Sequence, residues 1–165
     1  MSNPSTAGRP PAQDAYTLGS AAHRQFISRR SAATHAAFLL PHLKPGMRVL
    51  DAGCGGGSIT VGLAEAVAPG EVLGIDVDAR QLELAAALAR ERGLSNARFE
   101  SASIYDLPYP EGSFDAAFCH AVFMHLSDPL RALGQLRRVL RPGGILGLRE
   151  SDERGTYMSP EHPDI

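Results

Sequence analysis

Short hydrophobic runs alternate with longer amphipathic segments along most of the chain. The short runs are bounded by turn residues and predict strands at residues 48–51, 71–75, 98–101, 114–119 and 145–149. The segments between them carry hydrophobic residues at helical spacing. This alternation predicts an α/β protein with a parallel sheet, right-handed crossovers and helices on both faces.

Two of the helices are marked by residues suited to their ends. Asp78 is placed to cap a helix whose apolar face continues to Gly93. Asp128 and Pro129 form a suitable first turn for a second helix, and the Pro-Gly-Gly sequence at 142–144 is expected to stop it. Both helices are therefore predicted to cross between neighbouring strands.

The region before the first strand has a different composition. Residues 1–15 are rich in proline and small polar residues, which predicts a disordered tail. Hydrophobic residues then recur at near-helical spacing from Ser20 to His42, which predicts a helix. We expect residues 16–46 to form an N-terminal helical cap and residues 47–165 to form the core.

A glycine-rich turn after the first strand is the strongest sign of a ligand site. The sequence VLDAGCGGGS occupies positions 49–58, and four of the five residues from Gly53 to Gly57 are glycine. Glycine tolerates positive φ, so the backbone can curl with its N–H groups directed at a ligand. A helix that begins here adds a positive dipole end. A surface turn without a ligand is the alternative.

Ligands of open α/β sheets bind beyond the carboxyl ends of the strands, where three further segments are expected. Asp76 ends the second strand and is suited to bind the two hydroxyls of a ribose. Ser103 follows the third strand and can contact the edge of a planar base. Cys119 and His120 end the fourth strand, where Cys119 is equally well explained as a small core residue.

The overall composition favours a small-molecule partner. The chain has 165 residues, 44% of them hydrophobic and 21% charged, which suits one globular domain. A net charge of −2 gives no electrostatic reason to expect nucleic acid or an anionic membrane as a partner. No secretory or membrane-spanning pattern is present, so we expect a cytoplasmic protein with both cysteines reduced.

Taken together, these motifs resemble class I S-adenosylmethionine (SAM)-dependent methyltransferases. Positions 49–57 look like their motif I, and the sequence GIDVD at 74–78 looks like their acidic motif II. The sequences DLPYPEGSFD at 106–115 and LRPGG at 140–144 resemble the segments that lead into their fourth and fifth strands. The chain looks most like the small-molecule branch that includes ubiquinone and menaquinone biosynthesis methyltransferases.

The resemblance implies SAM as the cofactor, a small molecule as the methyl acceptor and a Rossmann-like fold. It implies that the glycine turn contacts the methionine part, that Asp76 binds the ribose, and that other residues surround adenine and the sulfonium. Tyr16 and Arg29 are implied to help close the pocket. The cofactor-binding residues expected in this way are Tyr16, Arg29, Gly53, Cys54, Gly55, Asp76, Val77, Gln81, Ser103, Ile104 and Cys119.

The sequence departs from the family pattern in two places. Ser103 stands where members often carry an aspartate that accepts a hydrogen bond from the adenine amino group. The family sheet has seven strands, whereas this sequence ends soon after the fifth, so we expect a core without the last two strands. Its open edge would be protected by a cover element or another subunit, such as a second copy of the chain.

The expected reaction is transfer of a methyl group to O, N or C of a small molecule, helped mainly by positioning. His120 and His125 are candidate bases, and a structural role is the alternative for each. No pair among the six histidines joins a cysteine or acid at metal-ligand spacing, so metal catalysis is not expected. A nicotinamide-dependent oxidoreductase is disfavoured because Ser58 replaces the third glycine of its fingerprint. A SAM-binding module without catalytic activity is the remaining alternative.

Overall fold

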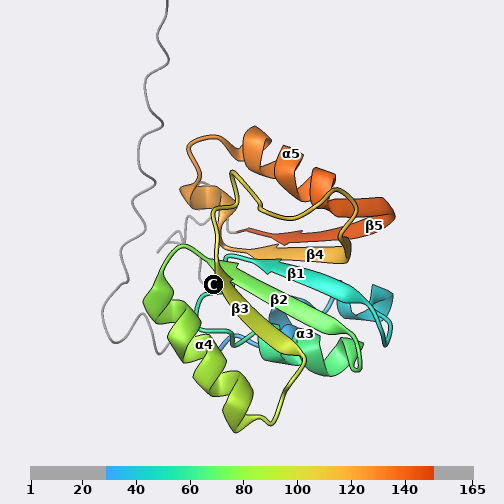
Figure 1. Ribbon diagram of the computed structural model, residues 1–165, viewed down its shortest axis with the longest axis vertical. Helices are drawn as coiled ribbons and strands as arrows, with labels where there is room; N and C mark the ends of the chain where they lie inside the picture. The colour runs from blue at the N-terminus through green and yellow to red at the C-terminus, as the bar shows by residue number, and fades with distance from the viewer. Residues whose placement is uncertain (1–28, 151–165) are drawn as a thin grey trace, which may run out of the picture.

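A computed structural model describes residues 29–150, which form a five-stranded sheet with helices on both faces (Figure 1). The strand order is β3-β2-β1-β4-β5, and all neighbouring strands are parallel. The predicted α/β fold is confirmed. The strands are β1 (Arg48–Ala52), β2 (Glu71–Asp76), β3 (Ala97–Ser101), β4 (Phe114–His120) and β5 (Leu140–Arg149).

The strand order reverses between β1 and β4. The chain first runs outward from β1 to β2 and β3, and then returns to place β4 on the other side of β1. At its end, Ala52 pairs with Ile75 of β2 and with Cys119 of β4. The connections that leave β1 and β4 therefore diverge to opposite faces and open a crevice at the carboxyl ends of the strands.

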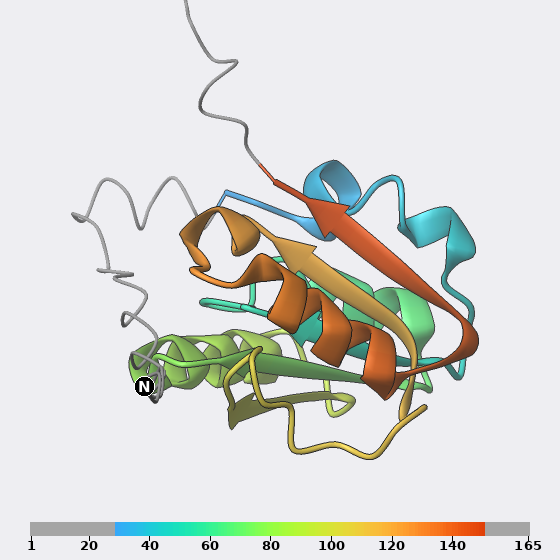
Figure 2. The same ribbon diagram turned by 90° about the horizontal axis from the view of Figure 1, so that it is seen from above.

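Neighbouring side chains of the inner strands β1, β2 and β4 belong to two separate cores. Val49 and Val72 belong to the core under α2 (Ala32–His35) and α3 (Thr60–Val67). On the same face, α4 (Ala79–Glu91) packs against β2 and β3. Leu50 and Leu73 belong to the other core, under α5 (Pro129–Val139). Helix α5 covers the face of the sheet opposite to α3 and α4 (Figure 2). Because both faces of these inner strands are buried, most of their residues are hydrophobic on both faces.

The capping residues predicted from the sequence are confirmed. The Asp78 carboxylate accepts a hydrogen bond from the Arg80 N–H at 3.0 Å, and α4 begins at the next residue. The Asp128 carboxylate accepts one from the Arg131 N–H at 3.0 Å at the start of α5. Each side chain thus satisfies a backbone donor that has no partner within its helix.

The prediction of a continuous helix that reaches His42 is wrong within the described residues. Helix α2 ends at His35, and a separate 3-10 turn, η1 (Leu40–His42), follows. Pro41 explains the break, because it has no N–H to donate and its ring would clash with the carbonyl of residue 37 in a continuous α-helix. The predicted tail at residues 1–15 lies outside the described residues.

Strand β5 begins earlier than predicted. It starts at Leu140, directly after α5, rather than at Ile145. Phe114 pairs with Leu140, but Ala116 pairs with Ile145, so the register shifts across the Pro-Gly-Gly sequence. Gly143 has φ +75° at this irregularity. The turn signal at 142–144 therefore marks a bulge inside the strand, where extra residues are accommodated without ending the pairing.

Candidate functional site

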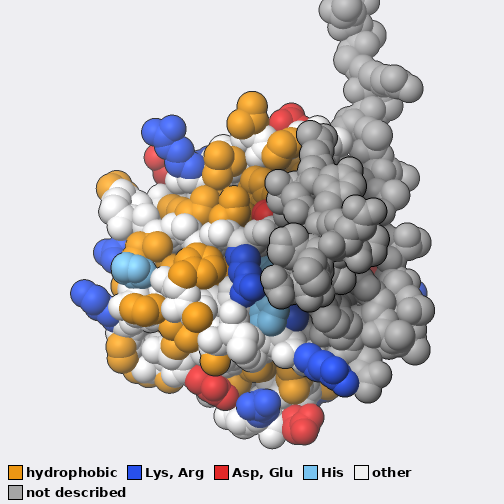
Figure 3. Space-filling view, turned by 180° about the vertical axis from the view of Figure 1, so that it is seen from behind, with side chains coloured by type: hydrophobic (Ala, Val, Ile, Leu, Met, Phe, Trp, Pro, Cys, Tyr) orange, Lys and Arg blue, Asp and Glu red, His pale blue; other side chains and the backbone are white. Residues whose placement is uncertain are grey.

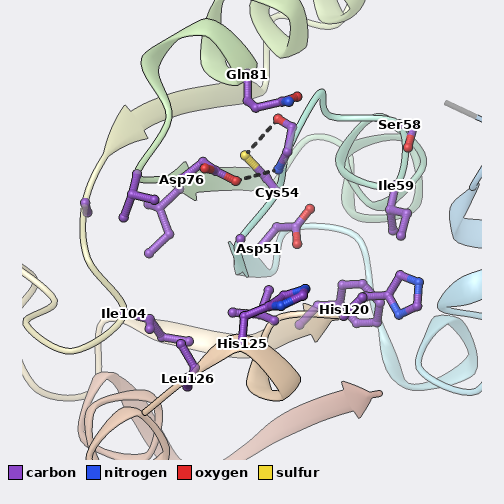
Figure 4. Close-up of a pocket in the computed structure, with 18 of the residues that line it drawn as sticks. Asp51, Cys54, Ser58, Ile59, Asp76, Gln81, Ile104, His120, His125 and Leu126 are labelled. Carbon is purple, nitrogen blue, oxygen red and sulfur yellow. Dashed lines mark hydrogen bonds between the residues drawn. The ribbon is translucent and has the colours of Figure 1, made fainter. Parts of the chain in front are cut away.

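A cavity of about 580 Å³ lies at the carboxyl ends of β1, β2 and β4 (Figure 4). Its volume is in the range typical of small-molecule sites. The predicted cofactor-binding residues that line it are Gly53, Cys54, Gly55, Asp76, Val77, Gln81 and Ile104. The structure thus brings together most of the residues that the sequence singled out from three separate strand ends.

The glycine turn is fastened to the end of β2 by main-chain hydrogen bonds. The N–H groups of Gly53 and Cys54 both donate to the Ile75 carbonyl oxygen, at 2.8 and 2.9 Å. Gly53 has φ +79° and Gly55 has φ +51°, conformations that a residue with a side chain rarely adopts. These two glycines allow the backbone to curl back over the neighbouring strand and to face the cavity.

Close packing adds a second reason for glycine in this turn. A Cβ atom on Gly53 would overlap Cγ2 of Val122, which comes from the segment after β4. A Cβ atom on Gly57 would lie 2.8 Å from the Ala85 Cβ atom of α4. The turn therefore forms one wall of the cavity and is also packed against two other parts of the fold.

Asp76 has an acceptor capacity that its protein contacts do not exhaust. Its Oδ2 atom accepts from the Gly55 N–H and its Oδ1 atom accepts from the Asp78 N–H, both at 2.9 Å. A carboxylate has about four acceptor positions, so about two remain in addition to these bonds. The backbone contacts orient the carboxylate, while the remaining lone pairs suit a ligand with adjacent hydroxyl groups.

Asp51 is a cavity residue that the sequence reasoning did not assign. Its side chain is 3% exposed, and the Thr60 hydroxyl donates to its Oδ2 atom at 2.6 Å. Burial raises the pKa of Asp51 to about 7, the nearby Asp76 adds to the rise, and the Thr60 hydrogen bond opposes it. An acid that follows the apolar residues of β1 just before the glycine turn was the available signal.

Two predicted residues of the core are turned away from the cavity. The Ser103 Oγ atom accepts a hydrogen bond from the Tyr105 N–H at 3.2 Å, and Ser103 does not line the cavity, whereas Ala102, Ile104 and Tyr105 do. Cys119 is fully buried in the core under α5 and does not line the cavity. Burial raises the pKa of its thiol, so this cysteine is protonated at neutral pH.

Of the two N-terminal residues predicted to close the pocket, the one that the structure describes does not line the cavity. Arg29 is exposed and does not line the cavity, but its neighbour Arg30 does. Tyr16 lies outside the described residues. The two cysteines form no disulfide with each other. Within residues 29–150, no helix has the length and apolar character needed to cross a membrane, and no cluster of three potential metal ligands occurs.

Both histidines suggested as bases line the cavity. His120 ends β4, and His125 ends the 3-10 helix η2 (Phe123–His125). The Nδ1 atom of His120 lies 2.9 Å from the Arg149 carbonyl oxygen, and its ring centroid lies 5.1 Å from that of His35. Burial lowers the pKa of His120, which favours the neutral imidazole at physiological pH.

The profile of a family described as "Methyltransferase domain" matches residues 43–160. The chain belongs to this family. An uncharacterized methyltransferase of Schizosaccharomyces pombe is 40% identical over 138 residues, which are 80% of this chain and 50% of the relative. A demethylmenaquinone methyltransferase of Deinococcus radiodurans is 34% identical over 162 residues, 86% of this chain and 65% of the relative. The resemblance to methyltransferases is confirmed.

Solved structures agree with the fold. A SAM-dependent methyltransferase from Aquifex aeolicus superimposes with a TM-score of 0.63 at 32% identity, over 68% of this chain and 61% of that one. A cyclase, SpnF, superimposes with a TM-score of 0.65 at 40% identity, over 73% of this chain and 47% of that one. The chain spans about half the length of the curated relatives it matches first.

Proposed function

We propose that this chain is a SAM-dependent methyltransferase that transfers a methyl group to an O, N or C atom of a small molecule. The observation that carries the proposal is the position of Asp76. Its carboxylate lines the cavity, is oriented by two backbone N–H groups and keeps lone pairs for a diol. A ribose placed there would lie beside the glycine turn, as a nucleoside cofactor requires.

The remaining cavity residues fit the other parts of SAM. Gly53 and Gly55 let the backbone approach the methionine part without a side chain between them. Val77, Ile104 and Tyr105 supply apolar surface for adenine. Asp51 faces the same cavity with a buried carboxyl group, which favours a ligand that carries positive charge. Ser103 remains a proposed contact only through its backbone, because its hydroxyl is engaged by Tyr105.

Catalysis in this proposal rests on positioning. Bound SAM supplies a methyl group on a positively charged sulfur, which is an activated leaving group. The chain's residues hold the acceptor in line with that methyl group and keep water away, and such orientation can lower a barrier by several kcal/mol, up to about 7–11 in ideal cases. The acceptor loses its proton to a base or to solvent.

Calorimetric titration of the full chain with SAM tests the proposal. Asp76→Ala should weaken binding by roughly 1.5–3 kcal/mol, about 10- to 150-fold, because a charged acceptor of two hydrogen bonds is lost. Asp76→Asn, which keeps one acceptor oxygen, should lose less. Glu83→Ala on the exposed face of α4 is the matched control and should bind like the wild type. Unchanged affinity in a folded Asp76→Ala variant would contradict the assignment.

A second candidate function is a module that binds SAM without transferring its methyl group. The solved relative named as a cyclase supports this candidate, because it shows a protein of the same fold that is named for a different reaction. Formation of S-adenosylhomocysteine in the presence of a panel of small acceptors would exclude it. Binding of NAD in preference to SAM would instead favour an oxidoreductase.

A further inference from the structure

Arg138 of α5 holds the backbone of another segment instead of facing solvent. Several basic side chains extend from the surface of the molecule, as the blue side chains at the rim of Figure 3 show. Arg138 is half-buried, and its guanidinium group donates to two main-chain carbonyl oxygens. Within residues 29–150 it forms no ion pair with a carboxylate. Its charge therefore strengthens hydrogen bonds to backbone, and what that backbone does indicates the role of Arg138.

The segment that Arg138 holds connects β3 to β4. The Nη1 atom donates to the Tyr109 carbonyl oxygen and the Nη2 atom to the Leu107 carbonyl oxygen, both at 2.7 Å. The main-chain carbonyl oxygen of Arg138 also accepts from the Gly112 N–H at 3.1 Å. Residues 107–112 contain no helix or strand, so no regular main-chain pairing fixes them. A single residue of α5 thus holds this irregular segment at three points.

Gln135, almost one turn earlier in α5, orients the guanidinium group of Arg138. Its Oε1 atom accepts from Nη2 of Arg138 at 2.9 Å and from Nε at 3.3 Å. The same oxygen accepts from the Leu107 N–H at 3.3 Å. Leu107 is therefore held at both its N–H and its carbonyl group, and its side chain is buried in the core under α5.

The held segment continues directly from one wall of the cavity. Ile104 and Tyr105 line the cavity and come just before Leu107 in the sequence. The Asp106 N–H donates to the Ser103 carbonyl oxygen at 3.1 Å, and these two residues form an isolated β-bridge. The wall residues therefore lie inside a tight turn that ends at Leu107. A displacement of Leu107 would move Ile104 and Tyr105 with it.

The start of α5 holds the outer end of the Tyr105 side chain. The main-chain N–H of Asp128 donates to the Tyr105 hydroxyl at 3.2 Å, and the Ser127 Oγ atom lies 3.4 Å from it. The Arg131 guanidinium carbon lies 5.6 Å from the centroid of the ring. These contacts fix the hydroxyl end of the ring, whereas the contacts of Arg138 fix the backbone just after Tyr105.

We propose that Arg138 positions the base of the cofactor, because it fixes the backbone that carries the cavity wall of Ile104 and Tyr105. This inference rests on the proposed binding of SAM. Arg138 acts through these wall residues, so it is a positioning residue and not a catalytic one. Without it, the carbonyl oxygens of Leu107 and Tyr109 lose their charged donors, and the segment moves to find other donors such as water. The wall then no longer packs closely against the base.

The test compares two ligands of the full chain, S-adenosylhomocysteine and S-ribosylhomocysteine. The second has the ribose and homocysteine parts of the first but no base. Arg138→Met keeps most of the length of the side chain and removes its donors. We expect it to weaken S-adenosylhomocysteine about tenfold, as for the loss of a close apolar contact, and to leave S-ribosylhomocysteine unchanged in a competition titration. Equal weakening of both ligands would overturn the inference, because a general loss of structure acts on both.

Three further variants separate the hydrogen bonds of Arg138 from its charge. Arg138→Lys keeps the charge but cannot bridge two carbonyl oxygens, so it should recover only part of the affinity for S-adenosylhomocysteine. It also serves as the test if Arg138→Met does not fold. Gln135→Leu removes the oxygen that orients the guanidinium group and should weaken this ligand less than Arg138→Met does. Arg137→Met, at the exposed neighbouring position of α5, should change neither ligand. A loss in Arg137→Met equal to that in Arg138→Met would overturn the inference.

Amide hydrogen exchange gives a readout that does not depend on ligand affinity, and it decides the matter if S-ribosylhomocysteine binds too weakly to compete. In Arg138→Met, the N–H groups of Asp106 and Leu107 should exchange faster than in the wild type, whereas that of Val49 in β1 should keep its rate. Unchanged exchange at Asp106 and Leu107 would overturn the inference.

The outcomes for the proposed function and for this inference are distinguishable. If S-adenosylhomocysteine does not bind the wild type, the proposed function fails, and the positioning of a base fails with it. If it binds the wild type and Arg138→Met equally well, the positioning role is wrong and the proposed function stands.

Discussion

The two ends of the cavity are built in different ways. The acidic end comes from two short stretches, 51–57 and 76–81, and its contacts are mostly backbone hydrogen bonds around Ile75 and Asp76. The basic end is assembled from three distant parts of the chain, which contribute Arg30, His120 and the Arg149 carbonyl. The acidic end therefore depends on contacts between two short stretches, whereas the basic end depends on segments that only the tertiary fold brings together.

Because of this difference, we expect variants at the two ends to affect different properties of the protein. Changes of backbone freedom in the glycine turn should affect cofactor binding and stability together, because the turn is both wall and support. Side-chain changes at the basic end should affect the acceptor and leave cofactor binding largely intact. Variants confined to one end therefore test whether this separation holds.

The largest expected effect is the pH dependence that Asp51 gives to stability. Its pKa is about 7 in the folded protein and 3.8 ordinarily, so the folded state holds a proton that the unfolded state releases. Its stabilising contribution is complete below pH 3.8 and is lost as the pH rises to about 7, roughly 4 kcal/mol in all. Urea unfolding across this range should show a loss of stability in the wild type that is absent from Asp51→Asn. The other carboxyl groups are common to both proteins, so their effect cancels in the comparison.

Thr60 provides a control for this prediction. Thr60→Val removes the hydroxyl that donates to Asp51, so the pKa of Asp51 should rise further and the loss of stability should extend to higher pH. Thr60→Ser keeps the hydroxyl and should behave like the wild type in this respect. Identical pH profiles for the wild type and Asp51→Asn would show that Asp51 is ionised like an exposed acid, and the two ends would then differ less in character.

The next effect compares two glycines with similar backbone angles. Gly53 has φ +79° and a Cβ atom there would overlap Val122, whereas Gly46 has φ +89° and open space around it. Gly46→Ala should cost roughly 1–2 kcal/mol from backbone strain alone. Gly53→Ala should cost a further 1–3 kcal/mol or so from overpacking and should also weaken SAM binding. Chemical denaturation and calorimetry would measure both. Equal losses of stability in the two variants would show that the structure around Gly53 adjusts to the added methyl group and that overpacking contributes little.

The smallest effect is expected far from both ends. Asp128→Ala removes the cap of α5 and should lower stability by about 1 kcal/mol without changing SAM affinity. Asp128→Ser retains a capping oxygen and should lose less. A large drop in SAM affinity in Asp128→Ala would mean that the capping carboxylate also positions the cavity wall, and the separation between the two ends would need revision.

Much of the fold was predictable because its signals are local. The strands, the caps Asp78 and Asp128, and the glycine turn are each encoded within a few neighbouring residues. The predictions were wrong where one local sequence is compatible with two structures. The Pro-Gly-Gly sequence at 142–144 could end a helix or form a bulge, and the strand pairing with β4 decided for the bulge. Pro41 prevents a continuous helix to His42, because it has no N–H to donate to the preceding turn.

The candidate site divides in the same way. The sequence by itself determined the glycine turn and Asp76, since a glycine-rich turn after one strand and a carboxylate at the end of the next are visible in residue type and position. Only the tertiary structure decided the rest. It turned Ser103 and Cys119 away from the cavity, and it brought Arg30 to His120 across 90 positions of sequence. The physical reason is that side-chain burial and charge pairing depend on which segments pack together, and no local pattern records that choice.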